Sequence, residues 1–206
     1  MKIYDENGQL LVLAAPDPHK TTHENTGTDE ISVAGLSGLL ADDQHVLDAE
    51  VVSAVEAAGL TFAENKGIIL DAVLSADGKY SGIMEAGTAG AILAFGDLVY
   101  LDGVAANNKW ELCDASAAAT AFGKIGICVL AAAENAATVI LLWGKVRADA
   151  VFPALTIGAP VHMSEVAGDI VVAAPVTAVA IVRIIGYGNT ADELFFCPDN
   201  TYLELA

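Results

Sequence analysis

Short apolar runs separated by turn residues fill the second half of the chain. Between Ala91 and Pro198 eight such runs are rich in β-branched and aromatic residues, and a ninth follows them. The runs span residues 92–95, 98–101, 109–113, 125–130, 138–146, 161–164, 169–173 and 179–187, with 193–197 as the ninth. This regular spacing predicts a mainly β protein with a C-terminal compact β-barrel or sandwich.

The clearest local structure is a hairpin over residues 123–147. Two β-favouring runs, 125–129 and 138–143, flank Glu134-Asn135, which supplies the turn residues. A buried helix through residues 130–133 is the alternative. Glycines at 123, 126 and 144 and the β-branched run 138–140 favour the hairpin. We expect Ile125, Ile127, Val139, Leu141 and Trp143 to serve core or inter-subunit packing, and any recognition surface to lie at turns such as Glu134-Asn135.

The second half also contains a faint internal duplication. Residues 96–101 resemble residues 158–163, which lie 62 positions later, and Ile125-Gly126 resembles Ile185-Gly186 at an offset of 60. Each copy would contain a strand, a turn with a second strand, and a third strand that includes a glycine. The pattern predicts a pseudo-symmetric β-fold.

The first half has a different pattern. Pro16-Asp17-Pro18 interrupts the chain, and residues 19–28 hold no apolar residue, so an extended N-terminal attachment arm is expected over residues 1–35. Asp42-Asp43 offers an N-cap for a helix that ends at Gly59. A short helical oligomerisation segment is therefore predicted over residues 36–60.

That helix carries a heptad-like stripe. Leu40, Leu47 and Ala54 are seven residues apart, and Val51 and Ala58 form a second such pair. These five residues are the predicted oligomer interface, in a short parallel bundle of three chains. Packing of the stripe on the chain's own core is the alternative, because two heptads alone do not decide it.

Residues 61–94 are predicted to form a small β connector before a C-terminal β-domain over residues 95–206. Residues 67–70 read as a strand, residues 76–79 as a hairpin-type turn, and residues 80–85 as the returning strand. Residues 87–90, two glycines among them, would end the connector as a flexible joint.

Composition narrows the classes of function. The chain has 206 residues, of which 54% are hydrophobic and 17% charged, and its formal net charge is −18. Such an acidic chain repels phosphate backbones and anionic membranes, so nucleic acid is not expected as a partner. No apolar run reaches the roughly 18 residues of a membrane-spanning helix, and residues 1–9 do not resemble a secretory signal. We expect a protein made in the cytoplasm, with no membrane insertion.

Few residues indicate reactive chemistry. His19 and His23 are four apart, with Glu24 and Asp29 nearby, and they are the candidate metal ligands; a polar, hydrogen-bonded linker is the alternative. The cysteines at 113, 128 and 197 have neither a metal-binding spacing nor an even number, and we interpret them as small buried hydrophobes. Carboxylates gather at predicted turns without a calcium-loop motif. The sequence predicts no cofactor and no enzymatic activity.

Two sets of segments resemble a known class of protein. The run PHKTTHENTGTDEISVAGLSGLLADDQHV, residues 18–46, resembles a segment of tailed-bacteriophage fibre and other virion surface proteins. The stretches GDLVYLD, WELCDA, GKIGICVLAAA, TVILLWGKVRADAVFPALTIGAPVHMS and VRIIGYGNTADELFFCP are similar to a β-rich terminal domain of such proteins. The two sets delimit residues 18–46 and 96–198, which are about two thirds of the chain.

The resemblance implies a homotrimeric, non-enzymatic structural protein at the virion surface. Its N-terminal region would join the major capsid protein or another virion protein, and its β-domain would project outward. The short distance between the His19 segment and the β-domain leaves no room for a long shaft, which favours a head fibre or capsid decoration protein.

Two other functions remain open at this point. A tail-fibre-type adhesin would bind a glycan or protein of the host cell surface. A metal-dependent hydrolase of host polysaccharide is the third, although no acid pair at a useful spacing supports it.

Overall fold

The computed structural model describes Tyr4 and residues 7–9, 62–103 and 108–206. The chain divides into two compact units, Met1–Gly67 and Ile68–Ala206. The predicted helical segment and nearly all of the predicted arm lie outside the described residues, and so do the five heptad residues. Every strand named below belongs to the second unit.

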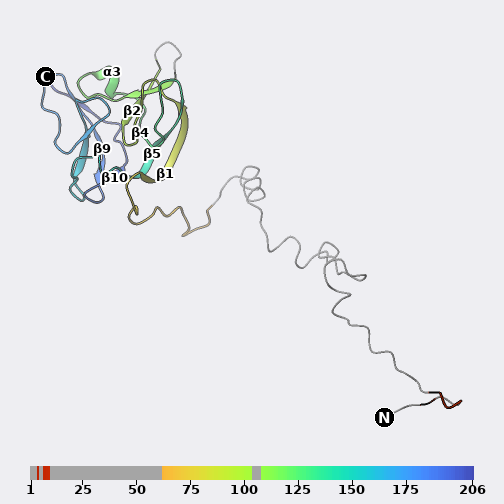
Figure 1. Ribbon diagram of the computed structural model, residues 1–206. Helices are drawn as coiled ribbons and strands as arrows, with labels where there is room; N and C mark the ends of the chain where they lie inside the picture. Colours follow the sequence, from red (N-terminus) through yellow and green to blue (C-terminus); the bar gives the residue numbers. More distant parts are fainter. Residues whose placement is uncertain (1–3, 5–6, 10–61, 104–107) are drawn as a thin grey trace. The chain divides into compact units, whose positions relative to one another are not determined.

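The second unit is mainly β, as predicted, and its antiparallel sheet curls into a half-barrel (Figure 1). One short helix, α3 (Ala118–Ala121), joins two strands. The strands are β1 (Lys79–Thr88), β2 (Leu98–Asp102), β3 (Lys109–Leu112), β4 (Ile125–Cys128), β5 (Ala137–Arg147), β6 (Pro160–Met163), β7 (Ile170–Val171), β8 (Ile181–Val182), β9 (Ile184–Gly188), β10 (Glu193–Phe196) and β11 (Leu203–Glu204).

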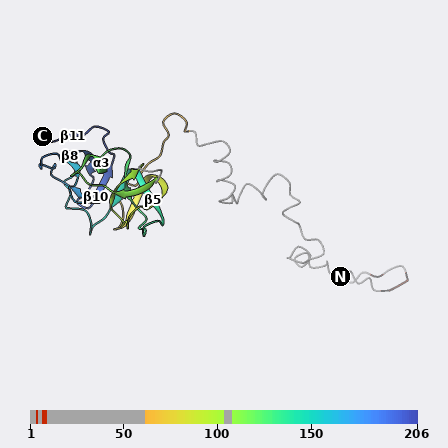
Figure 2. The ribbon, with the colours of Figure 1, turned by 90° about the horizontal axis from the view of Figure 1, so that it is seen from above.

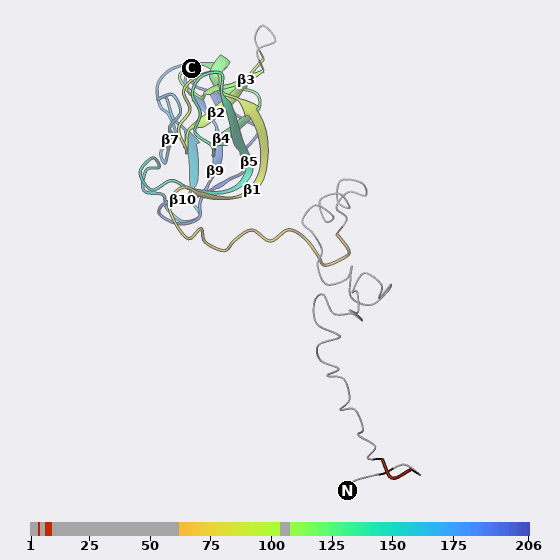
Figure 3. The ribbon, with the colours of Figure 1, turned by 45° about the vertical axis from the view of Figure 1, so that its right-hand side comes forward.

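Strand β5 is the centre of the sheet. Strand β1 pairs with it along residues 137–147, whereas β4 pairs only with residues 140–141 and β10 only with residues 144–147. A strand has two edges, and β1 occupies one of them, so β4 and β10 share the other. Two arms, β4-β2-β3 and β10-β9-β6-β7, therefore leave the same edge of β5 (Figure 3).

The structure confirms the hairpin at residues 123–147. Strand β4 pairs antiparallel with β5, with Ile127 opposite Leu141. The turn contains Asn135 at φ 65°, a left-handed conformation that asparagine tolerates well. The helix alternative through residues 130–133 is wrong, because Ala132 instead exchanges backbone hydrogen bonds with Leu93.

Several strand boundaries differ from those predicted. Residues 92–95 form a single bridge through Leu93 and no strand, and residues 179–187 divide into β8 and β9 at Arg183. Residues 67–70 are not a strand, and Ile69 is 94% exposed. The returning strand expected at residues 80–85 exists within β1, but its partner is the distant β5. Pairing with β5 satisfies the β1 backbone that the local hairpin would have used.

Two apolar clusters hold the unit together. The larger lies between the two arms and contains side chains of both, including Leu98 and Ile127 from one arm and Met163 and Phe196 from the other. The smaller is centred on Trp110 and packs the segment that follows β1 against β2, β3, β4 and β5. The interior is thus filled by side chains, and burial of this area is the main stabilising contribution.

The internal duplication is present in the strand pairing. Val99 lies opposite Gly126 in the first copy, and Val161 lies opposite Gly186 in the second. Strands β2, β3, β4 and β5 thus correspond to β6, β7, β9 and β10.

The turns that enter the two copies match as well. The amide of Gly96 donates to the carbonyl of Cys128 at 2.9 Å, and the amide of Gly158 donates to that of Gly188 at 2.8 Å. Both entry glycines have a positive φ, 95° and 75°, which other residues rarely adopt.

Candidate functional site

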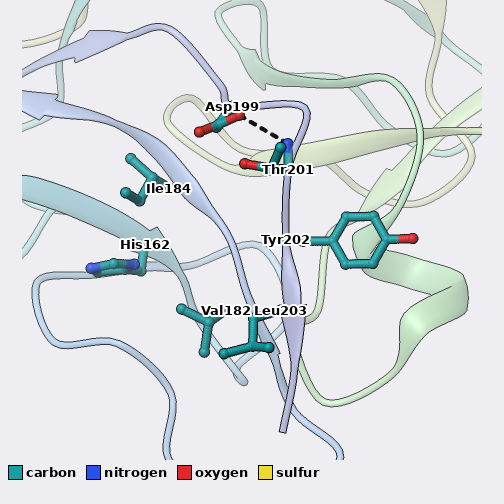
Figure 4. Close-up of a pocket in the computed structure, with 7 residues that line it drawn as sticks. All are labelled: His162, Val182, Ile184, Asp199, Thr201, Tyr202 and Leu203. Atoms are coloured by element: carbon teal, nitrogen blue, oxygen red, sulfur yellow. Dashed lines mark hydrogen bonds between the residues drawn. The ribbon is translucent and has the colours of Figure 1, made fainter.

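A pocket of about 290 Å³ lies on the second arm, beside the C-terminal residues (Figure 4). Strands β6, β8, β9 and β11 and the segment between β10 and β11 supply its walls. The lining residues are His162, Val182, Ile184, Asp199, Thr201, Tyr202 and Leu203. Figure 2 shows β8 and β11 beside α3, and the ring of Tyr202 stacks on that of Phe122 with 4.0 Å between centroids.

A β-bulge places two of these side chains on one face. Val161 pairs with Gly186 and His162 pairs with Ile184, so that Ile185 is the extra residue on β9. Ile185 joins the core, whereas His162 and Ile184 line the pocket on the opposite side of the sheet. Pairing of Leu203 with Val182 then brings the C-terminal strand against the pocket.

Two ionisable side chains of the pocket, His162 and Asp199, have lowered pKa values, which favour a neutral imidazole and an ionised carboxylate. Burial lowers the pKa of His162, whose side chain is 9% exposed and whose Nδ1 has no hydrogen-bond partner among the described residues. The backbone amide of Thr201 donates to Asp199 Oδ1 at 2.9 Å and lowers the pKa of that carboxyl group. The pocket therefore presents a neutral imidazole and an ionised carboxylate.

The described side chains of the pocket form no hydrogen-bonded pair with His162. No hydrogen bond joins His162 to Asp199 or to the Thr201 hydroxyl in the described structure, so no oriented nucleophile and base are present there. Within residues 62–103 and 108–206, no group of three or more His, Cys, Asp or Glu side chains is placed to hold a metal ion. The remaining walls are Tyr202 and aliphatic side chains from β8, β9 and β11.

The candidate ligands His19 and His23 and the interface residues Leu40, Leu47, Val51, Ala54 and Ala58 lie outside the described residues. The cysteines are described. Cys113 and Cys128 are buried, as interpreted, while Cys197 is half-buried. Burial raises the pKa of all three thiols, that of Cys113 to about 12, so they are poor nucleophiles in the native protein.

A second feature is an exposed row of large side chains across the outside of the sheet. We define the aromatic face as Ile83, Trp143, Phe195, Tyr187 and Pro160, from β1, β5, β10, β9 and β6. Ile83 lies opposite Trp143, Phe195 opposite Tyr187, and Tyr187 opposite Pro160. The rings of Trp143 and Phe195 meet edge to face with 5.1 Å between their centroids. This contact joins the part of the row on β1 and β5 to the part on β10, β9 and β6.

Sequence reasoning did not find the aromatic face as a surface. It assigned Trp143 to core or inter-subunit packing. The side chain is 42% exposed, as is that of Tyr187, so Trp143 is not a core residue of this chain. The available signal was strand alternation, since Trp143 and Lys145 share one side of β5 and Val146 the other. A bulge at Leu142, however, shifts this alternation relative to the first half of the strand.

The chain matches no protein-family model, no curated protein and no solved structure. Among the described residues, no helix is both long enough and apolar enough to cross a membrane.

Proposed function

We propose that the protein is a non-enzymatic structural protein of a bacteriophage virion. In this proposal it is a homotrimeric head fibre or capsid decoration protein. Its N-terminal region binds the major capsid protein or another virion protein, and its β-unit faces outward from the virion surface. No cofactor takes part.

The observation that carries the proposal is the division of the chain into two units, the second of which is a duplicated β-module filled by its own side chains. A small decoration protein needs one unit that attaches it to the particle and a second unit that projects from the surface. The resemblance of residues 18–46 and of the β segments to virion surface proteins points the same way.

The charge of the whole chain and the surface of the β-unit are compatible with this role. The chain carries 27 acidic against 9 basic residues, which favours solubility and disfavours binding to nucleic acid. Its described pocket is small and lined by both aliphatic and polar side chains. A virion surface protein needs a stable, soluble shell of this kind and no reaction centre.

The test is to locate the protein on purified virions by immunogold labelling with antibodies against the β-unit. The proposal predicts label distributed over the capsid, at the density of a symmetric decoration. Antibodies against the major capsid protein and against a tail protein provide the controls. Label confined to the tail tip would contradict the proposal and support the receptor-binding adhesin.

A further inference from the structure

The duplicated fold contains one face twice, and in the described part of the chain one copy of this face is buried while the other is exposed. In the first copy, Leu98, Ile127 and Leu141 lie side by side across β2, β4 and β5. All three are fully buried in the large cluster between the arms. This row is the packing surface on which the second arm rests.

Described residues leave the corresponding row of the second copy largely at the surface. Pro160, Tyr187 and Phe195 lie side by side across β6, β9 and β10, in the same register as the buried row. Pro160 is exposed, Tyr187 is 42% exposed and Phe195 is half-buried. Large apolar side chains thus occupy, at the surface, the positions that the first copy uses for its core.

Strand β1 and the middle of β5 extend this row. Ile83 and Trp143 are 57% and 42% exposed, and Trp143 contacts Phe195. Two residues further along β5, Lys145 donates to the carbonyls of Asp71 and Ala72, which precede β1. The aromatic face is therefore continuous with β1 and is bounded by the segment that leads into it.

The charges around the aromatic face decide what can approach it. The strands β1, β5, β6, β9 and β10 carry only two carboxylates, Glu85 and Glu193. Glu85 forms an ion pair with Lys124, and Glu193 is fully buried and accepts a hydrogen bond from the Leu74 amide at 2.6 Å. In a chain with net charge −18, this is a surface on which another acidic molecule meets little like-charge repulsion.

We infer that the aromatic face is a contact surface between copies of this chain. The inference rests on the homo-oligomer of the proposed function and names the surface of the β-unit that holds it together. Two copies, each strongly acidic, associate where carboxylates are absent or already paired, and Trp and Tyr side chains supply the apolar contact area. The internal duplication supports a partner of this kind, because the equivalent row is covered by a β layer of the same chain.

The experiment measures the mass of the full chain by sedimentation equilibrium over a range of concentrations. Tyr187→Glu places a carboxylate at the centre of the aromatic face, and Ile83→Glu places one on β1. Val176→Glu is the matched control, because its side chain is 88% exposed between β7 and β8 and is not part of the face. We expect wild type and V176E to form the same oligomer, and Y187E and I83E to associate at least about tenfold more weakly.

Fluorescence supplies a second measurement that does not depend on mass. The chain has two tryptophans, and Trp110 is 1% exposed while Trp143 lies in the aromatic face. Dilution of the wild-type oligomer should shift the emission to longer wavelength as Trp143 meets water. The shift should be absent in Trp143→Phe. Circular dichroism establishes that each variant is folded. If Y187E does not fold, I83E, whose substitution lies on an edge strand, provides the comparison with wild type.

Three outcomes would overturn the inference. Folded Y187E and I83E with the wild-type mass would show that the oligomer is held elsewhere, and the proposed virion role would stand. A wild-type chain that is monomeric at all concentrations would remove the copy-to-copy contact, and virion labelling would then decide the proposed role separately. Variants that keep their mass but no longer bind purified particles or host cells would assign the aromatic face to a different partner.

Discussion

His162 shows how one side chain depends on its neighbours. The sequence offers no neighbour that would indicate a role for this histidine. In the structure its ring is buried, and its Nδ1 has no hydrogen-bond partner among the described residues. A buried polar atom without a hydrogen bond costs about 1–3 kcal/mol, so the position is tolerated and not optimal. Its location at the pocket comes from the bulge at Ile185 and from the C-terminal strand.

Protonation of His162 should make stability depend on pH. Burial lowers the folded-state pKa below its ordinary value of 6.5, so folding favours the neutral ring. The unfolded state therefore takes up a proton first, and the free energy of unfolding falls as the pH drops from about 6.5 toward the folded-state pKa. Urea unfolding at several pH values should show this loss in wild type and a flatter profile in His162→Leu. Above pH 7.5 the two profiles should run parallel, and parallel profiles at all pH values would contradict the prediction.

The cysteines allow a second prediction at this scale. The thiolate is the reactive form, and burial raises the pKa of Cys113 to about 12. Cys113 and Cys128 should therefore resist an aromatic disulfide reagent at pH 8 in the native protein, while the half-buried Cys197 reacts first. In urea all three should react at similar rates. Mass spectrometry after alkylation identifies the modified positions, and early labelling of Cys113 would show that the predicted burial is wrong.

At the scale of elements, the sheet depends on glycines where strands approach closely. A Cβ on Gly186 would lie 2.2 Å from the backbone oxygen of Phe195, and one on Gly126 would lie 2.2 Å from the Cγ2 of Ile140. Both glycines occupy the same place in the two copies of the duplication. Their nearest obstacles differ. At Gly186 it is a backbone carbonyl held in the sheet, whereas at Gly126 it is a buried side chain that can yield by a small displacement, with the backbone oxygen of Leu141 at 3.0 Å.

Alanine at these positions should separate the two cases. We expect Gly186→Ala to lower the free energy of unfolding by about 1–3 kcal/mol, and Gly126→Ala by less. Gly103→Ala is the control, since no atom lies within 4 Å of its Cβ position, and its effect should stay within about 0.5 kcal/mol. Denaturant unfolding measures all three. An equal loss in the two strand variants would mean that the sheet at β9 can shift as freely as a side chain.

At the scale of the whole molecule, Arg183 connects parts that are far apart in sequence. It is 3% exposed, and its guanidinium donates to the carbonyls of Ala121, Gly123 and Asp199. These bonds tie the end of α3 to the second arm and to the C-terminal segment. Among the described residues no carboxylate forms an ion pair with this group, and backbone carbonyls stabilise the buried cation.

Removal of this group should cost more than removal of an exposed ion pair. We expect Arg183→Met to lower the free energy of unfolding by about 2–4 kcal/mol, because several buried carbonyls lose their donor. Lys124→Met is the matched comparison. Its pair with Glu85 is exposed on both sides, and its loss should cost less than about 1 kcal/mol. Urea unfolding distinguishes the two variants, and equal losses would mean that water replaces the guanidinium at the carbonyls.

Local pattern was sufficient for most strands and insufficient for their partners. The apolar runs correctly located β2, β3, β4, β5, β6, β7 and β10, because alternation and β-branched residues act over a few residues. The pairing of β1 with β5 was missed, since it joins segments about 60 residues apart. The pocket was missed for the same reason, as His162 and Leu203 meet only after β8 and β11 pair.

The sequence by itself determined that this chain is mainly β and that its second half contains a duplicated unit. It also determined that its three cysteines have neither a metal-binding spacing nor an even number. These features depend on residue type and on spacing along the chain. Tertiary structure alone decided which copy of the repeated face is buried. Leu98, Ile127 and Leu141 became core while Pro160, Tyr187 and Phe195 stayed outside, because both arms leave the same edge of β5 and only one of the two equivalent faces can lie between them.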